Sequence, residues 1–135
     1  MNLELIDKKI AEILEKRNAL SNINYDDDRY DQVEEELHNL EDQLIEDFGE
    51  YFESVLENVH DEICPNNEIL LPTAYLPKIT YKNENNEYDF EGKQGVLIDA
   101  IGYKGKDTRL VLVPFPTRLI LLIGGKEKKV VWRAK

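Results

Sequence analysis

The stretch of residues 26–63 constrains the fold of this chain more than any other, because it contains a single glycine, Gly49, and no proline. Apolar side chains recur along it at spacings of three and four residues, and this spacing places them on one face of a helix. A straight helix of this length would extend roughly 55 Å, more than the diameter of a small domain. Gly49 leaves open a division into two helices near 27–48 and 50–63, but the apolar pattern keeps its period and favours one unbroken helix.

Both ends of the predicted helix carry local signals. The aspartates Asp26, Asp27 and Asp28 place acceptors and negative charge where the free N–H groups and the helix dipole favour them. Pro65 cannot continue a helix and disfavours helical geometry in the residue before it, so the helix should end near Ile63. We therefore expect the three aspartates to cap the long helix at its N-terminus.

Residues 3–20 carry a second helical pattern, a heptad seam in which Arg17 is the only charged member. A short polar connection follows, so the two helices should fold back on each other as an antiparallel hairpin. Because Arg17 lies near the tip of this hairpin, we expect it to form a structural ion pair with the aspartates at 26–28 or with Asp31. The first helix, roughly 27 Å long, can cover only the first half of the long one.

The second half of the long helix keeps an apolar face that the first helix cannot reach. Leaving such a face in water would cost several kcal/mol at about 25 cal/mol per Å². Either the C-terminal part of the chain or a second copy of the protein must therefore cover it. Four residues of this face form the predicted interaction surface: Phe48, Tyr51, Phe52 and Val55.

Beyond the long helix the helical period is lost. Residues 65–78 are predicted to form an extended connector, and residues 79–135 contain short alternating segments separated by turn residues. The segment 119–123 is apolar at every position, so both of its faces should be buried. The sequence therefore predicts an α+β fold, with an N-terminal antiparallel helical hairpin in residues 1–64, the connector, and a C-terminal antiparallel β meander or small barrel.

Charge is unevenly distributed along the chain, whose net charge is −11. Residues 26–63 carry sixteen acidic residues and one basic residue, whereas residues 64–135 carry twelve basic and eight acidic residues. A helix this acidic repels nucleic acid and anionic membranes. The simpler explanation of its charge is a solvated helix face that keeps the protein soluble, and the alternative is a surface that binds a basic partner, such as the C-terminal half of a second copy. No apolar run approaches the ~20 residues that span a bilayer, so we expect no membrane contact. We also expect a cytoplasmic protein, because the sequence has no secretory pattern and only one cysteine.

Two features of the sequence contain metal-ligand residue types. Two Glu-x-x-His pairs lie on the long helix, roughly 33 Å apart, too far to form one site. The aspartates at the hairpin tip could hold Mg²⁺, but helix capping is the simpler explanation for them. We therefore expect no metal and no cofactor. The residues that remain as weak candidates for metal ligands are Asp26, Asp27, Asp28, Glu35, His38, Glu57 and His60.

Basic and aromatic residues gather in the β segment, as they do in small β barrels that bind single-stranded nucleic acid. The alternation of the last strand puts Trp132 on the inward face, so nucleic-acid binding is not favoured. No phosphate-binding glycine loop, zinc-type Cys/His set or nucleophile motif is present. Enzymatic activity remains an open alternative, but the sequence contains no signature of an enzyme.

An acidic tip on a helical hairpin, followed by a C-terminal β segment, resembles the layout of bacterial transcript-cleavage factors that enter the secondary channel of RNA polymerase. The resemblance is one of layout alone, because no motif of that family is found and the first helix is shorter than that family's arm. It implies, as an alternative, an accessory factor of a nucleic-acid enzyme whose tip at residues 26–28 inserts into a basic channel. Our main hypothesis is a non-enzymatic interaction or assembly protein that binds a protein partner or pairs with a second copy as a homodimer.

Overall fold

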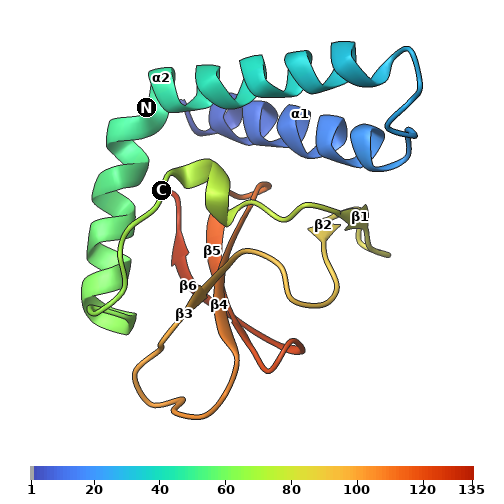
Figure 1. The fold of residues 1–135 in the computed structure, drawn as a ribbon. Coiled ribbons are helices and arrows are strands. Elements are labelled where there is room, and N and C mark those ends of the chain that lie inside the picture. Colours follow the sequence, from blue (N-terminus) through green and yellow to red (C-terminus); the bar gives the residue numbers. More distant parts are fainter. Residues whose placement is uncertain (1) are drawn as a thin grey trace.

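The computed structural model describes residues 2–135 and confirms the α+β architecture, with two helices followed by antiparallel strands (Figure 1). Within these residues, no helix combines the length and the apolar character needed to cross a membrane. The elements in chain order are α1 (Leu3–Ser21), α2 (Tyr30–Ile63), the 3-10 helix η1 (Pro72–Tyr75), β1 (Tyr81–Lys82), β2 (Tyr88–Asp89), β3 (Val96–Ile98), β4 (Thr108–Val113), β5 (Arg118–Ile123) and β6 (Glu127–Arg133).

The helix α2 begins at Tyr30, four residues after the predicted start, so the expectation that the aspartates at 26–28 cap it was wrong. The Asp27 carboxylate accepts a hydrogen bond from the backbone N–H of Arg29 at 2.8 Å and forms an ion pair with its guanidinium at 3.1 Å. These bonds to Arg29 lower the pKa of Asp27. The carboxylate therefore closes a turn in the loop instead of capping the helix, as Asp side chains often do in turns.

α2 is one unbroken helix of 34 residues, as predicted, but it is not a straight rod. Figure 1 shows a sharp bend in its middle, where the colour passes from teal to green, and the bend divides α2 into two arms. Gly49 lies in this middle part, and a Cβ atom built there would meet only the Ile45 side chain at 3.5 Å, in ordinary contact. Glycine permits such a bend because, without a Cβ atom, its backbone is less restricted than that of other residues.

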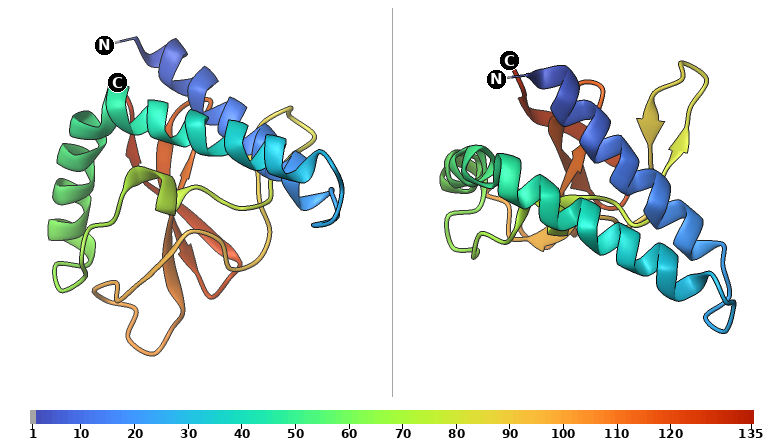
Figure 2. Two further views of the ribbon diagram at one scale, coloured as in Figure 1. Left: turned by 45° about the horizontal axis from the view of Figure 1, so that its top comes forward. Right: turned by 90° about the horizontal axis from the view of Figure 1, so that it is seen from above.

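The two arms of α2 have different neighbours. The first arm packs beside α1 to form the predicted hairpin, and the second arm runs alongside the sheet (Figures 1 and 2). Phe52 and Leu56 of the second arm are 1% and 2% exposed, and the ring of Tyr51 lies 6.2 Å from that of Trp132 in β6. The sheet of the same chain therefore covers the apolar face that α1 cannot reach, which is the first of the two alternatives left open by the sequence.

The main sheet is an open antiparallel meander with the strand order β3-β4-β5-β6. β1 and β2 form a separate two-stranded hairpin, and in the described chain β3 and β6 do not pair with each other. The sheet therefore does not close into a barrel. A register shift between Leu119 and Ile120 marks an irregularity in the pairing of β5 with β6.

Every apolar residue of β5 is buried, which confirms the prediction that both faces of this strand are covered. One face packs against the helices in the main core, and the other packs in a smaller cluster that includes Phe90. The ammonium group of Lys128 lies 4.2 Å from the centre of the Phe90 ring and covers it from outside. The side chains on the two faces are Leu119, Leu121 and Ile123, and Ile120 and Leu122, respectively.

The connector is more ordered than the predicted extended segment, because it contains the 3-10 helix η1, which begins at Pro72. Tyr75 of η1 is fully buried, and its hydroxyl lies 2.9 Å from Nε2 of His60 on α2. The same hydroxyl accepts a hydrogen bond from the Leu70 N–H at 3.1 Å. These bonds satisfy the buried polar atoms and fix the connector to the second arm of α2.

Candidate functional site

α1 holds the connector in place mainly through Arg17. The guanidinium donates hydrogen bonds to the carbonyl oxygens of Thr73 and Leu76, both at 3.0 Å, and of Pro77 at 3.3 Å. It also donates to the carboxylate of Glu41 at 3.1 Å. The planar fork of Arg donors suits such a convergent set of acceptors, so one side chain ties α1, α2 and the connector together.

The predicted structural ion pair of Arg17 exists, but the expected partners were wrong. Arg17 pairs with Glu41, not with the loop aspartates or Asp31. Among the loop aspartates, Asp27 is already engaged by Arg29. The donors of the guanidinium are used by Glu41 and by three carbonyl oxygens of the connector, which lie away from the tip.

The neighbouring contacts fix the end of the connector and the turn before β3. The side-chain amide of Asn18 donates to the carbonyl oxygen of Thr80 at 3.1 Å and accepts from its N–H at 3.0 Å. The N–H of Lys78 donates to Oε1 of Gln94 at 2.9 Å. Gly95 has a φ of 80°, and a Cβ atom there would lie 2.2 Å from a carbonyl oxygen of β4, so only glycine fits this close approach.

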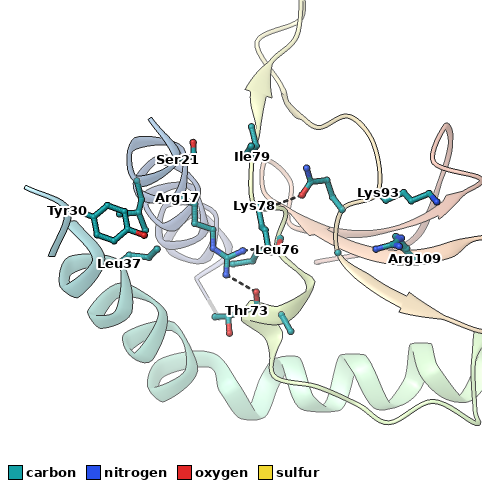
Figure 3. Close-up of a pocket in the computed structure, with 14 residues that line it drawn as sticks. Arg17, Ser21, Tyr30, Leu37, Thr73, Leu76, Lys78, Ile79, Lys93 and Arg109 are labelled. Atoms are coloured by element: carbon teal, nitrogen blue, oxygen red, sulfur yellow. Dashed lines mark hydrogen bonds between the residues drawn. The ribbon is translucent and has the colours of Figure 1, made fainter. Parts of the chain in front are cut away.

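These contacts frame a groove of about 640 Å³ between the hairpin, the connector and the turn before β3. Figure 3 shows Arg17 in its middle, with Tyr30 and Leu37 on one side and Lys93 and Arg109 on the other. Of the fourteen lining residues four are basic and none is acidic, although the net charge of the chain is −11. The basic residues are Arg17, Lys78, Lys93 and Arg109, and the larger apolar ones are Leu20, Leu37, Leu76 and Ile79.

Part of this positive charge is compensated by Asp107, which lies beside the groove. Arg109 donates to both oxygens of Asp107 at 2.9 and 3.3 Å, and Lys93 lies 3.7 Å from the same carboxylate. The hydrogen bond from Arg109 lowers the pKa of Asp107 and keeps the carboxylate ionised. One carboxylate thus serves two cations, and Lys78 has no ion pair with any residue from 2 to 135. The groove therefore keeps an excess of positive charge next to the exposed side chain of Ile79.

The structure does not bring the metal-ligand candidates together. Within residues 2–135, no group of three or more His, Cys, Asp or Glu side chains is placed to hold a metal ion. His60 is buried and bonded to Tyr75, whereas Glu57 is exposed. Glu35 and His38 are both exposed on the first arm of α2.

The hairpin tip, residues 22–29, projects from the end of the molecule opposite the bend (Figure 1). Tyr25 is 84% exposed, and its ring lies 5.1 Å from that of Tyr30, which lines the groove. Asp26 and Asp28 are exposed, whereas Asp27 is partly buried beside the backbone it bonds. The acidic tip and the basic groove therefore adjoin each other.

The four residues of the predicted interaction surface differ in accessibility. Phe52 and Val55 are buried beneath the sheet of their own chain. Phe48 and Tyr51 are partly buried and pack against the edge of the same core. Access by a partner is therefore confined to the outer edges of Phe48 and Tyr51.

Sequence reasoning did not single out Lys78, Ile79 or Lys93. They come from segments that are distant from α1 in the sequence and form no local motif, so only the fold brings them to one groove. The available signal was the excess of basic over acidic residues after position 64 in an otherwise acidic chain. No family model, curated protein sequence or solved structure matches this chain.

Cys64 is fully buried at the C-terminal end of α2 and offers a test of this packing. Burial, and to a smaller degree the Asp99 carboxylate, raise the pKa of its thiol from 9.0 to about 11. A raised thiol pKa stabilises the folded state below the unfolded-state pKa, and this contribution is lost as the pH rises through the folded-state pKa.

The free energy of unfolding should therefore fall between pH 9 and pH 11 by more in the native protein than in Cys64→Ala. Urea unfolding of both proteins across this range measures the difference. Burial, and to a smaller degree Cys64, raise the pKa of Tyr75, so part of this difference comes from the interaction of Tyr75 with the thiol. In addition, Ellman's reagent at pH 8 should react with Cys64 far more slowly in the folded than in the urea-unfolded protein. Equal rates in the two states would contradict the burial of this thiol.

Proposed function

We propose that this protein is a non-enzymatic interaction or assembly protein whose groove binds an acidic, partly apolar segment of a protein partner. The observation that carries the proposal is a groove with four basic and no acidic lining residues in a chain of net charge −11. A local positive potential attracts carboxylates, while the acidic surface of α2 repels them elsewhere. Electrostatics therefore favours an acidic segment at the groove over the surface of α2.

The two sides of the groove suit two kinds of side chain. Lys93 and Arg109 lie on one side and can pair with carboxylates, whereas Tyr30 and Leu37 lie on the other and offer apolar surface (Figure 3). The volume of about 640 Å³ falls within the range of pockets that enclose ligands in proteins. The bonds of Arg17 to the connector hold the walls in place, which reduces the ordering cost of binding.

A short fluorescently labelled peptide of alternating Glu and Leu residues tests this proposal by fluorescence anisotropy. We expect saturable binding to the native protein, and a loss of affinity of about tenfold or more in the double variant Lys78→Glu/Lys93→Glu, because two attractive charges become repulsive. An acidic peptide is the appropriate probe, since a basic one would be attracted to α2 wherever it met that helix.

The matched control is Lys104→Glu/Lys106→Glu, which makes the same change of charge in the exposed loop between β3 and β4. This variant should bind the acidic peptide like the native protein. The proposal is contradicted if the peptide does not bind, or if both double variants weaken binding equally. In the second case the effect would come from net charge and not from the groove.

A further inference from the structure

We infer that the occupant of the groove is the hairpin tip of a second copy of this chain, so that each copy inserts its tip into the groove of the other. This inference rests on the proposed function of the groove and names its partner. It follows from the chemistry of residues 22–29 and from where they lie relative to the groove.

The tip carries the groups that complement the groove. Tyr25 is 84% exposed, so nearly all of its ring is accessible to a partner. The exposed carboxylates of Asp26 and Asp28 form no side-chain hydrogen bond or ion pair with the part of the chain that the structure describes. Asp27 and Arg29 pair with each other and nearly cancel in charge. The tip therefore offers one aromatic ring and two unpaired negative charges.

The position of the tip allows both copies to be occupied at once. Ser21 and Tyr30 line the groove and also lie next to the two ends of the tip, and the Tyr25 ring lies 5.1 Å from that of Tyr30. Tip and groove thus form one continuous patch on the molecule. A two-fold dimer requires the same patch on both subunits to be self-complementary, and a patch with an acidic half and a basic half meets this condition.

The expected balance of forces gives a specific but modest association. Burial of Tyr25 against the apolar lining residues, among them Leu20 and Ile79, supplies the hydrophobic contribution, and such aromatic anchors dominate many interfaces. Pairing of Asp26 and Asp28 with Lys78 and Lys93 fixes the orientation. The net charge of −11 on each copy opposes association, so the dimer should form at high protein concentration and dissociate on dilution.

Sedimentation velocity of the full chain over a wide concentration range, together with a charge exchange, tests the inference. Variant A carries Asp26→Lys/Asp28→Lys, and variant B carries Lys78→Glu/Lys93→Glu. Each variant alone should be monomeric, because its tip and groove carry like charge. An equimolar mixture should form a dimer again, because the basic tip of A meets the acidic groove of B, and the acidic tip of B meets the basic groove of A.

A control pair on other surfaces, Glu53→Lys/Glu57→Lys on the second arm of α2 and Lys104→Glu/Lys106→Glu, should dimerise like the native protein. A native protein that stays monomeric at every concentration, or a dimer that survives in A and in B, would overturn the inference. If the native protein is monomeric but its groove still binds the acidic peptide, the proposed function stands and the partner is a different protein. If neither dimer nor peptide binding is observed, both proposals fail.

Discussion

Replacing Arg17 with Ala should lower the free energy of unfolding by about 3 kcal/mol, a large effect for a polar residue. The substitution would leave the Glu41 carboxylate and three connector carbonyl oxygens without their donor. The side chains of Arg17 and Glu41 are only 15% and 20% exposed, so water would replace this donor poorly. Urea unfolding followed by circular dichroism measures the loss. Since Arg17 also holds the walls of the groove, affinity for the acidic peptide should fall even where Arg17→Ala remains folded.

Two further variants separate the role of the hydrogen bonds from that of charge. Arg17→Lys keeps the positive charge but cannot reach all four acceptors, so it should recover only part of the lost stability. Arg29→Ala removes a guanidinium from the exposed tip and should leave stability unchanged within error. Equal stability of Arg17→Ala and Arg29→Ala would show that Arg17 does not anchor the connector.

Replacing Phe52 with Ala should lower the free energy of unfolding by about 3–5 kcal/mol, as expected for a large cavity in a core. Phe52 is 1% exposed and lies in the cluster that joins the second arm of α2 to the sheet. In the same variant, unfolding followed by Trp132 fluorescence should begin at a lower urea concentration than unfolding followed by circular dichroism. Trp132, the only tryptophan, contacts Tyr51 of this arm, so its fluorescence reports directly on docking of the arm.

The expected result for Phe52→Ala is an early change in Trp132 fluorescence and a shifted urea midpoint in circular dichroism. Phe52→Leu keeps most of the buried volume and should cost about 1 kcal/mol. Leu97→Ala, at a position 59% exposed on β3, should have little effect. If Phe52→Ala and Leu97→Ala were equally stable, the second arm would not be docked on the sheet in solution.

Local sequence patterns were sufficient to predict the two helices and the antiparallel strands, but not the 3-10 helix η1 or the first residue of α2. The apolar spacing of three and four along α2, the stop at Pro65 and the uniformly apolar segment of β5 each depend on neighbouring residues alone. The same patterns could not predict the direction of α2 after Gly49, because a bend requires only that a glycine permit it and that both arms find something to pack against. The sequence shows the first condition but not the second.

The groove lay beyond sequence reasoning for a related reason. Lys78, Lys93 and Arg109 come from the connector, a turn and a strand, and their convergence depends on tertiary contacts. Arg17 was recognised as a structural cation on an apolar seam, but its acceptors are mostly backbone carbonyl oxygens, which every residue possesses and no pattern distinguishes. The partner of Arg17 and the groove were therefore missed for the same reason, because both depend on tertiary contacts that leave no local pattern in the sequence.

The bend in α2 also limits how this chain can vary in length. Each residue inserted into a helix rotates everything beyond it by about 100°. An insertion between Leu44 and the bend would turn Leu37 and Leu44 away from α1 while the second arm stayed docked on the sheet, so the two arms are fixed to each other in helical phase. Changes of length should thus be tolerated in exposed loops such as 83–87, where no buried face has to keep its register.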